Sequence, residues 1–462
     1  MFLVRGSFYC AMMPLWEGWD EYAHFAWLQH WLDKGALPGF HDPVSREIDE
    51  SMRVAPLPYE LRWIGPPYLT HSQWWALPEA ERATRVRMLK SMPANWAHEA
   101  AMHSFDFYEA QQPPLYYWMA SVALRIASGW PLEWRVLFIR LLSMALASLA
   151  IPFAWMASRR VYCAALIAIA PGFMIDVSRV ANDCLAIALV AVLVWMLSRE
   201  KTRGWSVGMV LGAALLTKAY LLALVPALMV IWWRRRRDLA VALLLAAAMA
   251  GWWYLRNLAL GYSLSGWMIH ASGAQLLRGV VEINWFSAAH VIAKSFLWFG
   301  GWSFLTLKRW IYLIVELAAL ASCVPAWKRR GEKLRAPAVL VGFYVLAMAY
   351  GVVVYWVGQR VPNLPGWYLW PMATPMAAIL VTGLRAWSRA LALALGAIDI
   401  YGAAALLVPY YAGLAERNKA AAGQFLAGLH RLDIPLWLGV SWILATLGIV
   451  MIVFMTNYEG DS

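Results

Sequence analysis

The sequence predicts an all-α polytopic membrane protein, and three features of its composition carry that prediction. Of the 462 residues, 62% are hydrophobic and only 14% are charged, and the mean hydropathy is +0.54. A soluble domain has about 25% charged and ~45–50% apolar residues. This chain lacks the polar surface that would keep it in water, which excludes soluble, disordered, coiled-coil and secreted-scaffold classes. Its 30 Trp and 20 Tyr are typical of aromatic belts at membrane interfaces.

The apolar runs then give the order of the elements. Residues 1–13 are the end of a first transmembrane segment, and a large extracytoplasmic loop with amphipathic helices follows over 14–112. We expect a transmembrane core over 113–258, a second extracytoplasmic loop over 259–308, and C-terminal transmembrane helices over 309–462. Because a crossing needs about 20 apolar residues, these runs predict 11 to 13 helices: 136–157, 179–198, 239–258, 309–326, 337–357, 367–384, 389–409 and 435–456, with shorter ones at 115–128, 161–175, 205–218 and 220–233.

The basic residues indicate the orientation. The net charge of +12 is better explained by cytoplasmic loops that obey the positive-inside rule than by a nucleic-acid partner. Basic clusters at 199–203, 234–237, 328–335 and 385–389 are therefore placed in the cytoplasm. The side of Arg159 and Arg160 stays open, because 115–128 either crosses the membrane or is re-entrant. The four Cys stand singly in apolar surroundings, so they indicate neither a disulfide framework nor a metal site.

The 14–112 loop carries 14 of the 27 acidic residues. A structureless loop of this length would be unusual, so we expect it to be folded and functional. Within it, 21–34 is predicted to be an amphipathic helix along the membrane surface, and 77–92 has weaker helical character.

An acidic pair follows the first apolar segment. Asp20 and Glu21 are flanked by Trp16, Trp19 and Tyr22, and burial among aromatic rings raises a carboxyl pKa toward the range of a general base. The alternative is an acidic cap, which the helix macrodipole favours at an N-terminus.

The same pair could hold a divalent cation, the one cofactor that the sequence suggests. Carboxylate oxygens are suitable ligands for such an ion, and His24 lies one helical turn beyond Asp20.

Several charged residues near helix ends are candidates for anion binding. Lys218 interrupts an apolar stretch and either meets a lipid phosphate or snorkels to the surface. Asp183 is a cap or a second acidic arm of the site. Arg256 and Arg360 are phosphate clamps or interfacial anchors. Gln111-Gln112-Pro-Pro reads by itself as a helix entry, since Pro is tolerated in a first turn.

Five short stretches occur in an order that resembles a known family. They are EGWDEYAH (17–24), QPPLYYW (112–118), ND (182–183), TK (217–218) and YLWP (368–371). The chain resembles the membrane glycosyltransferases of the GT-C fold, and most of all glycosyltransferase family 39, with its protein O-mannosyltransferases and lipid A aminoarabinose transferases.

The resemblance implies a GT-C type bundle and an enzyme that takes sugar from a polyprenyl-phosphate donor. Asp20 would be the base, supported by Glu21 or a metal, and Lys218 would hold the donor phosphate with Tyr368 and Arg360 nearby. Aminoarabinose-type members have an acid and a base directly before the two prolines. Here those positions are Gln111 and Gln112, so Glu109 is expected to substitute. The family's Arg-Tyr is Trp367-Tyr368 here, and Arg360 is expected to compensate.

The predicted function is inverting transfer to an acceptor lipid, glycan or protein at the outer face of the bacterial inner membrane. The partners are the donor, the acceptor and membrane lipids, without nucleic acid. The alternatives are a lipid-diphosphate-dependent polysaccharide ligase or polymerase, which would need a more basic outer loop, and a transporter of lipid-linked sugars. A transporter would need charged groups near the bilayer midplane on several helices.

Overall fold

A computed structural model describes residues 1–63, 68–102, 107–266, 269, 271–329, 331–362 and 364–456, without the side chains of Glu332 and Lys333. The described residues form helices joined by short loops and no β-strand longer than an isolated bridge. The all-α polytopic prediction is confirmed. Six helical segments in this part of the chain are long and apolar enough to cross a membrane: 132–158 (α7, Leu132–Ser148, and α8, Ala150–Ser158), α14 (Arg236–Ala259), α17 (Arg309–Lys328), α18 (Glu332–Gln359), 366–411 and α23 (Leu436–Met455).

The segment 366–411 contains two of the predicted spans in one continuous run, and shorter helices complete the core. Its parts are η6 (Gly366–Met372), α19 (Ala373–Leu384), η7 (Arg385–Trp387), α20 (Ser388–Tyr401), η8 (Gly402–Leu407) and α21 (Val408–Tyr411). The shorter core helices are α1 (Phe2–Met12), α6 (Leu115–Ile126), α9 (Val161–Ile169), α10 (Pro171–Val177), α11 (Asp183–Leu197), α12 (Gly204–Leu215), η4 (Ala219–Ala223) and α13 (Leu224–Ile231).

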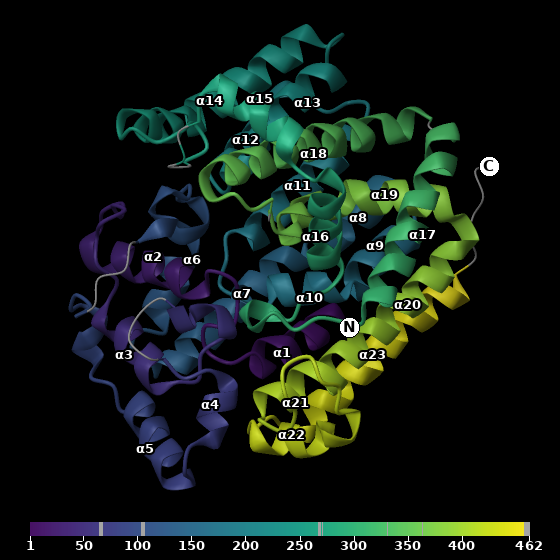
Figure 1. Cartoon of the computed structure of the whole chain (residues 1–462). Coiled ribbons are helices and arrows are strands. Elements are labelled where there is room, and N and C mark those ends of the chain that lie inside the picture. The colour runs from purple at the N-terminus through teal and green to yellow at the C-terminus, as the bar shows by residue number, and fades with distance from the viewer. Residues whose placement is uncertain are drawn as a thin grey trace.

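Outside the core, the N-terminal loop is folded into short helices that gather on one side of the molecule (Figure 1). Its elements are α2 (Glu21–Lys34), α3 (Arg46–Val54), η1 (Tyr59–Trp63), α4 (His71–Ala76), α5 (Glu79–Lys90), η2 (Ala94–Ala97) and η3 (Tyr108–Gln111). The other connections hold α15 (Gly273–Glu282), α16 (Trp285–Leu297), η5 (Gly301–Ser303), η9 (Ala422–Gln424) and α22 (Phe425–Arg431).

The helix α2 differs from the amphipathic surface helix that we expected. All residues from Glu21 to Gln29 are buried, and Trp27 stacks on Tyr117 of α6 with 4.3 Å between ring centroids. The polar side chains of α2 make internal contacts, which a sequence pattern of apolar spacing does not reveal. This helix therefore belongs to the protein interior and places its first turn beside the core.

The sequence left open whether 115–128 crosses the membrane or is re-entrant, and contacts at its end and at two arginines favour a re-entrant segment. The turn after α6 lines one cavity together with Lys90 and His98 of the N-terminal loop, so α6 ends on the same side as that loop. Arg160 donates to the Thr382 hydroxyl, and Arg329 donates to the Thr382 carbonyl oxygen. The segment 132–158, which is long and apolar enough to cross a membrane, therefore leads from the side of the N-terminal loop to the side of the 328–335 cluster. Arg330 of that cluster falls outside the described residues.

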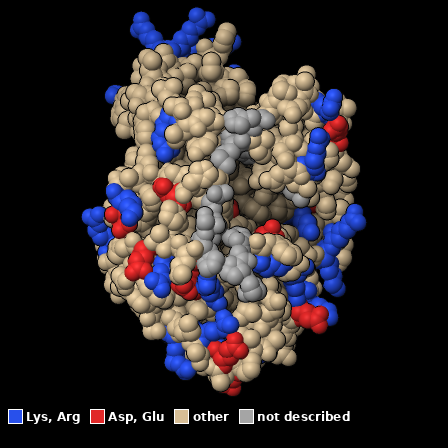
Figure 2. All heavy atoms as spheres, turned by 60° about the vertical axis from the view of Figure 1, so that its left-hand side comes forward, with Lys and Arg blue, Asp and Glu red and all other residues tan. Residues whose placement is uncertain are grey.

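Charges are distributed unevenly over the surface. Figure 2 shows basic side chains projecting from the upper end, where α13 and α14 lie. Acidic and basic side chains are interspersed over the lower half, and a hollow opens between the two parts. The separation agrees with the positive-inside assignment of the 234–237 cluster.

A buried ion pair joins the first helix to α20. Arg5 of α1 lies 2.9 Å from Asp399 of α20, and neither side chain is exposed. The Asp399 carboxylate also accepts from the Tyr9 hydroxyl at 2.8 Å, from the Trp442 indole at 2.9 Å and from the Thr446 hydroxyl at 3.1 Å. Such complete pairing is what a charge in an apolar interior requires. The network fixes α1 against α20 and α23.

We expect Asp399→Asn to destabilise the protein, because it leaves the Arg5 charge buried without its counter-ion. Removal of one partner of a buried pair costs about 3–5 kcal/mol, so the unfolding temperature in detergent should fall clearly. The double variant Arg5→Met/Asp399→Leu should recover part of the loss. The control is Glu416→Gln, whose exposed pair with Lys419 contributes little. Equal unfolding temperatures for Asp399→Asn and Glu416→Gln would contradict the assignment.

Candidate functional site

Asp20 does not act as a helix cap. It is the residue before α2, but its side chain makes no capping hydrogen bond. The carboxylate is half-buried and accepts a hydrogen bond from the Tyr108 hydroxyl instead. Its backbone is left-handed, with φ at 57°, and Trp16 in the same loop has φ at 64°. Non-glycine residues in this conformation persist only where their surroundings hold them, and such positions cluster at functional sites.

Glu17 anchors the loop that carries Asp20. The buried carboxylate lies 3.0 Å from His71 Nε2 and accepts from the backbone N–H and the hydroxyl of Ser303 at 2.8 and 3.0 Å. A Cβ on Gly301, where φ is +58°, would lie 2.5 Å from Glu17 Oε1, so this close approach requires glycine. Three segments distant in sequence thus hold the loop in one conformation.

Glu21 is occupied by an arginine, and this corrects its predicted catalytic role. Its carboxylate accepts from Arg140 Nε at 2.7 Å and from Arg140 Nη2 at 2.5 Å. It also accepts from the Val180 N–H at 3.0 Å, and it is fully buried. A carboxylate that is bound bidentately by an arginine and closed off from solvent is neutralised and out of reach of a substrate.

The predicted cation site at Asp20, Glu21 and His24 does not form. Glu21 is paired as above, and the buried His24 Nδ1 lies 2.7 Å from the Tyr117 hydroxyl. Burial and the nearby positive charges of Arg179 and Lys218 lower the pKa of His24 well below its usual range. Among the residues that the structure describes, no group of three or more His, Cys, Asp or Glu could hold a metal ion.

Lys218 lies in the interior and does not snorkel. Only 2% of the residue is exposed, and its Nζ lies 2.6 Å from Asp183 Oδ1 and 3.1 Å from Asn182 Oδ1. Arg179 reaches Asp183 Oδ2 and Asp176 Oδ1, both at 2.8 Å. Asp183 is thus neither a helix cap nor a free acid, because two cations share its charge.

Aromatic and amide side chains complete the surroundings of Lys218. Its Nζ lies 5.2 Å from the Tyr220 ring centroid and 5.5 Å from that of Tyr368, within the range of cation–π attraction. Asn182 donates to Gln112 Oε1 at 3.0 Å, which ties the start of α6 to the start of α11. Sequence reasoning named Tyr368 and Gln112, and the structure brings both to this cluster.

Glu109 is the second acid near Asp20. It is buried, and no hydrogen bond reaches its Oε2 from the described residues. Burial and then the Asp20 charge raise the pKa of Glu109 to about 8. Burial also raises the pKa of Asp20, although the Tyr108 hydroxyl, Arg179 and Lys218 act in the opposite direction. Because Glu109 stays protonated at neutral pH, it adds no negative charge beside Asp20, and Asp20 is free to act as the base.

The remaining two predicted phosphate ligands lie elsewhere, which corrects their predicted role. Arg360 is exposed and pairs with Glu282 of α15 at 3.1 Å. Arg256 is half-buried, lies 4.8 Å from the Trp253 ring centroid and donates to the Pro38 carbonyl oxygen at 3.4 Å. Neither makes a contact with Asp20 or Lys218 among the described residues. Both contacts agree with the alternative interpretation, in which these arginines are interfacial anchors.

The partners Tyr108, Arg140 and Arg179 were missed by sequence reasoning. Each pairs with a site residue, but Arg140 lies 119 positions from Glu21 and Tyr108 lies 88 positions from Asp20. Only the Arg179–Asp183 pair had a local signal, since its i,i+4 spacing puts both side chains on one face.

Comparisons with known proteins add two similar structures. No family model and no curated protein matches the chain. Two crystal structures of ArnT from Cupriavidus metallidurans are similar, one bound to undecaprenyl phosphate and one in the apo state. They are 16% and 15% identical, each with a TM-score of 0.42, over 94% of this chain and 72% and 74% of ArnT. A likeness at this TM-score carries no argument about the site, which is described from the chain's own residues alone.

We expect the Glu109 proton to make stability depend on pH. The folded state keeps this proton to a pH of about 8, whereas an unperturbed Glu loses it near 4.5. Between these values the folded state binds more protons than the unfolded state. The contribution of Glu109 to the free energy of unfolding is therefore fully present below pH 4.5 and is lost as the pH rises toward 8. Unfolding temperatures between pH 5 and 8 should therefore fall less for Glu109→Gln than for the unmodified protein. Glu81→Gln, an exposed change on α5, should keep the full slope. A Glu109→Gln variant with an unchanged slope would contradict the raised pKa.

Proposed function

We propose that this integral membrane protein is a GT-C type glycosyltransferase that moves a sugar from a polyprenyl-phosphate donor to an acceptor hydroxyl. The main support is the gathering of a half-buried acid, a buried cation and an aromatic ring in one cluster. Arg179 donates to the carbonyl oxygen of Trp19, the residue before Asp20, at 2.8 Å and shares the Asp183 carboxylate with Lys218. Lys218 Nζ lies 5.5 Å from the Tyr368 ring centroid. The resemblance of the ordered motifs implies site roles for the same three residues.

In the proposed reaction Asp20 is the general base. It removes the proton of the acceptor hydroxyl as that oxygen attacks the anomeric carbon from the face opposite the phosphate. The bond between the anomeric carbon and the phosphate oxygen breaks, and its electron pair leaves with the polyprenyl phosphate. The proton ends on Asp20, and the configuration of the sugar is inverted.

Lys218 would stabilise the negative charge that develops on the leaving phosphate. To meet a phosphate oxygen, its Nζ must share or give up its 2.6 Å contact with Asp183. Arg179 remains on the other oxygen of Asp183 at 2.8 Å, so that carboxylate keeps a counter-ion during the exchange. Tyr220 and Tyr368 would flank the phosphate.

A divalent metal does not fit the residues that the sequence suggested for it. Glu21 is neutralised by Arg140, and His24 faces the Tyr117 hydroxyl. No step of the proposal runs through a metal.

We propose the bacterial inner membrane as the location, with the N-terminal loop and the site facing the periplasm. The separation of the basic clusters from the N-terminal loop supports this orientation. A diphosphate donor is less well suited, because Arg179 and Lys218 already share the charges of Asp176 and Asp183. A transporter is not favoured, because the acids near Asp20 lie where the N-terminal loop meets the core.

We expect Asp20→Asn to lower the rate of transfer about 10²- to 10⁴-fold, the usual contribution of a general base. The measurement is sugar transfer from a polyprenyl-phosphate donor in proteoliposomes. Activity of the unmodified protein should rise with pH as Asp20 loses its proton, at a pH above the ordinary range of an Asp. Asp42→Asn, in an exposed turn of the same loop, is the matched control. Full activity of Asp20→Asn would remove Asp20 from the reaction.

We expect Lys218→Gln to lower kcat/KM for the donor roughly 10- to 100-fold, because a hydrogen bond to a charged group contributes about 1.5–3 kcal/mol. Lys218→Arg, which keeps the charge, should restore part of the activity. Arg278→Gln, an exposed change on α15, is the control. Unfolding temperatures of the variants separate lost chemistry from lost folding. If Lys218→Gln folds normally and retains its kcat/KM, Lys218 does not hold the phosphate.

A further inference from the structure

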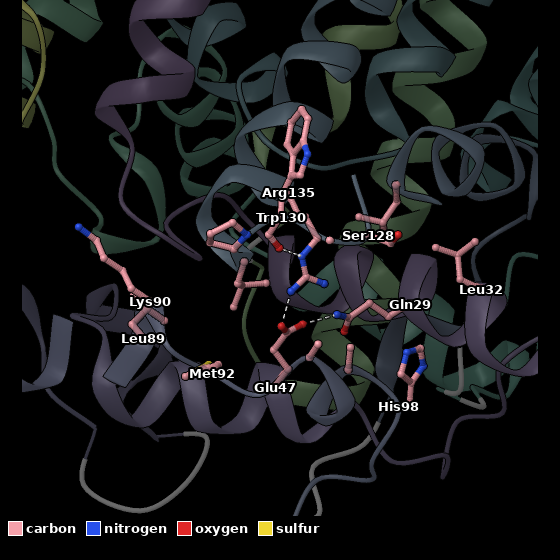
Figure 3. A pocket seen from close by; sticks show the side chains of 16 residues that line it. Gln29, Leu32, Glu47, Leu89, Lys90, Met92, His98, Ser128, Trp130 and Arg135 are labelled. Atoms are coloured by element: carbon pink, nitrogen blue, oxygen red, sulfur yellow. Dashed lines mark hydrogen bonds and ion pairs between the residues drawn. The ribbon is translucent and has the colours of Figure 1, made fainter. Parts of the chain in front are cut away.

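A cavity lies away from Asp20, between the N-terminal loop and the start of α7. It encloses about 440 Å³, within the range of small-molecule sites. Its walls come from α2, α3, the end of α5, η2 and the turn between α6 and α7 (Figure 3). Leu32, Leu89 and Leu124 give it apolar walls beside its polar floor.

An ion pair forms the floor of this cavity. Arg135 donates through Nη2 to Glu47 Oε1 and through Nε to the Trp130 carbonyl oxygen, the latter at 2.9 Å. Gln29 Nε2 donates to the other Glu47 oxygen at 2.7 Å, and Gln29 Oε1 accepts from Ser45. Both Arg135 and Glu47 are more than nine-tenths buried. The acceptor atoms at the floor are therefore already used.

The groups left over are hydrogen-bond donors. Arg135 Nη1 has no hydrogen-bond partner among the described residues, and Figure 3 shows this nitrogen without a dashed contact. Lys90, at the end of α5, also lines the cavity, and its ammonium group points away from Arg135 in Figure 3. The Ser128 hydroxyl adds a third donor. Because Glu47 and Arg135 neutralise each other, Lys90 leaves the cavity with one net positive charge, and the unused N–H groups of Arg135 point to an oxyanion as the ligand.

The cavity lies at the membrane boundary. Leu132, which lines it, is also the first residue of the membrane-spanning segment 132–158. Trp130 and Trp134 are 47% and 60% exposed beside it, as interfacial Trp residues are, and Ile126 at the end of α6 is 74% exposed. A ligand that reached the cavity from the bilayer could keep its acyl chains against this apolar surface.

We propose that this cavity binds the anionic phosphate headgroup of a membrane lipid. Arg135 Nη1 would contact the phosphate oxygens, and the Lys90 side chain would turn toward them on binding. The leucine side chains would contact the glycerol and the first methylene groups. The inference rests on the cavity alone and does not depend on the proposed transferase activity.

Gly129 permits a variant that fills the cavity without touching the ion pair. It lies in the turn between α6 and α7 and lines the cavity, and a Cβ built there meets no atom within 4 Å. Its φ is not in the left-handed region, so a larger residue causes no backbone strain. Gly423→Trp is the matched control, because Gly423 is exposed in η9 and is equally open.

The experiment measures lipid retention by native mass spectrometry of the detergent-purified full chain. Phosphatidylglycerol and phosphatidylcholine are added separately. We expect the unmodified protein and Gly423→Trp to retain phosphatidylglycerol several-fold more than phosphatidylcholine. Gly129→Trp and Lys90→Gln should lose this preference. Competition with soluble glycerol phosphate identifies the source: displacement indicates a free organic phosphate as the ligand, and no displacement indicates the lipid.

Two outcomes would overturn the proposal. One is equal retention of the anionic and the zwitterionic lipid by the unmodified protein. The other is an undiminished preference in Gly129→Trp. If Gly129→Trp fails to fold, Ser128→Trp and Lys90→Gln carry the test, and a preference retained in both is equally decisive.

Discussion

The bidentate contact between Arg140 and Glu21 is the interaction on which the geometry of the site depends. Arg140 of α7 also donates to the carbonyl oxygens of Cys10, Met13 and Pro14 at 3.1, 2.6 and 2.8 Å. These carbonyls lie at the end of α1, where helix geometry leaves acceptors unpaired. One guanidinium thus closes the end of α1 and holds the first residue of α2. The loop between them, which carries Asp20, is fixed at both ends.

Because the interior of the protein is apolar, buried cations are paired with acids throughout the structure. Burying a charge without a partner is prohibitively unfavourable, so each buried cation brings at least one acid to a defined place. Arg5 with Asp399 positions α1, Arg140 with Glu21 positions the loop, and Arg179 with Lys218 positions Asp183. In a chain with 14% charged residues, these pairs set much of the tertiary arrangement.

Asp20 differs from these paired acids, and this difference leaves its carboxylate able to accept a proton. Among the described residues its carboxylate meets a neutral hydroxyl and no cation in direct contact, whereas Glu17, Glu21 and Asp183 are each held by a charged or imidazole partner. An acid that is held in place but not neutralised can still accept a proton. The left-handed backbone at Asp20 keeps the side chain turned from the helix end that it would otherwise cap.

The sequence by itself determined the environment of the protein, its helical class and several members of the site. Hydrophobic composition and run length report these properties directly, because each depends on local residues. Lys218 and Asp20 can also be recognised from local sequence. Lys218 is a charge within an apolar stretch, and Asp20 follows the end of an apolar segment. Only the tertiary structure decided which charges are neutralised. Glu21 looks identical to Asp20 in the sequence, yet its partner Arg140 lies 119 positions away, and Arg360 is drawn to Glu282 across 78 positions. Pairing over such distances depends on how helices pack, which no local pattern encodes.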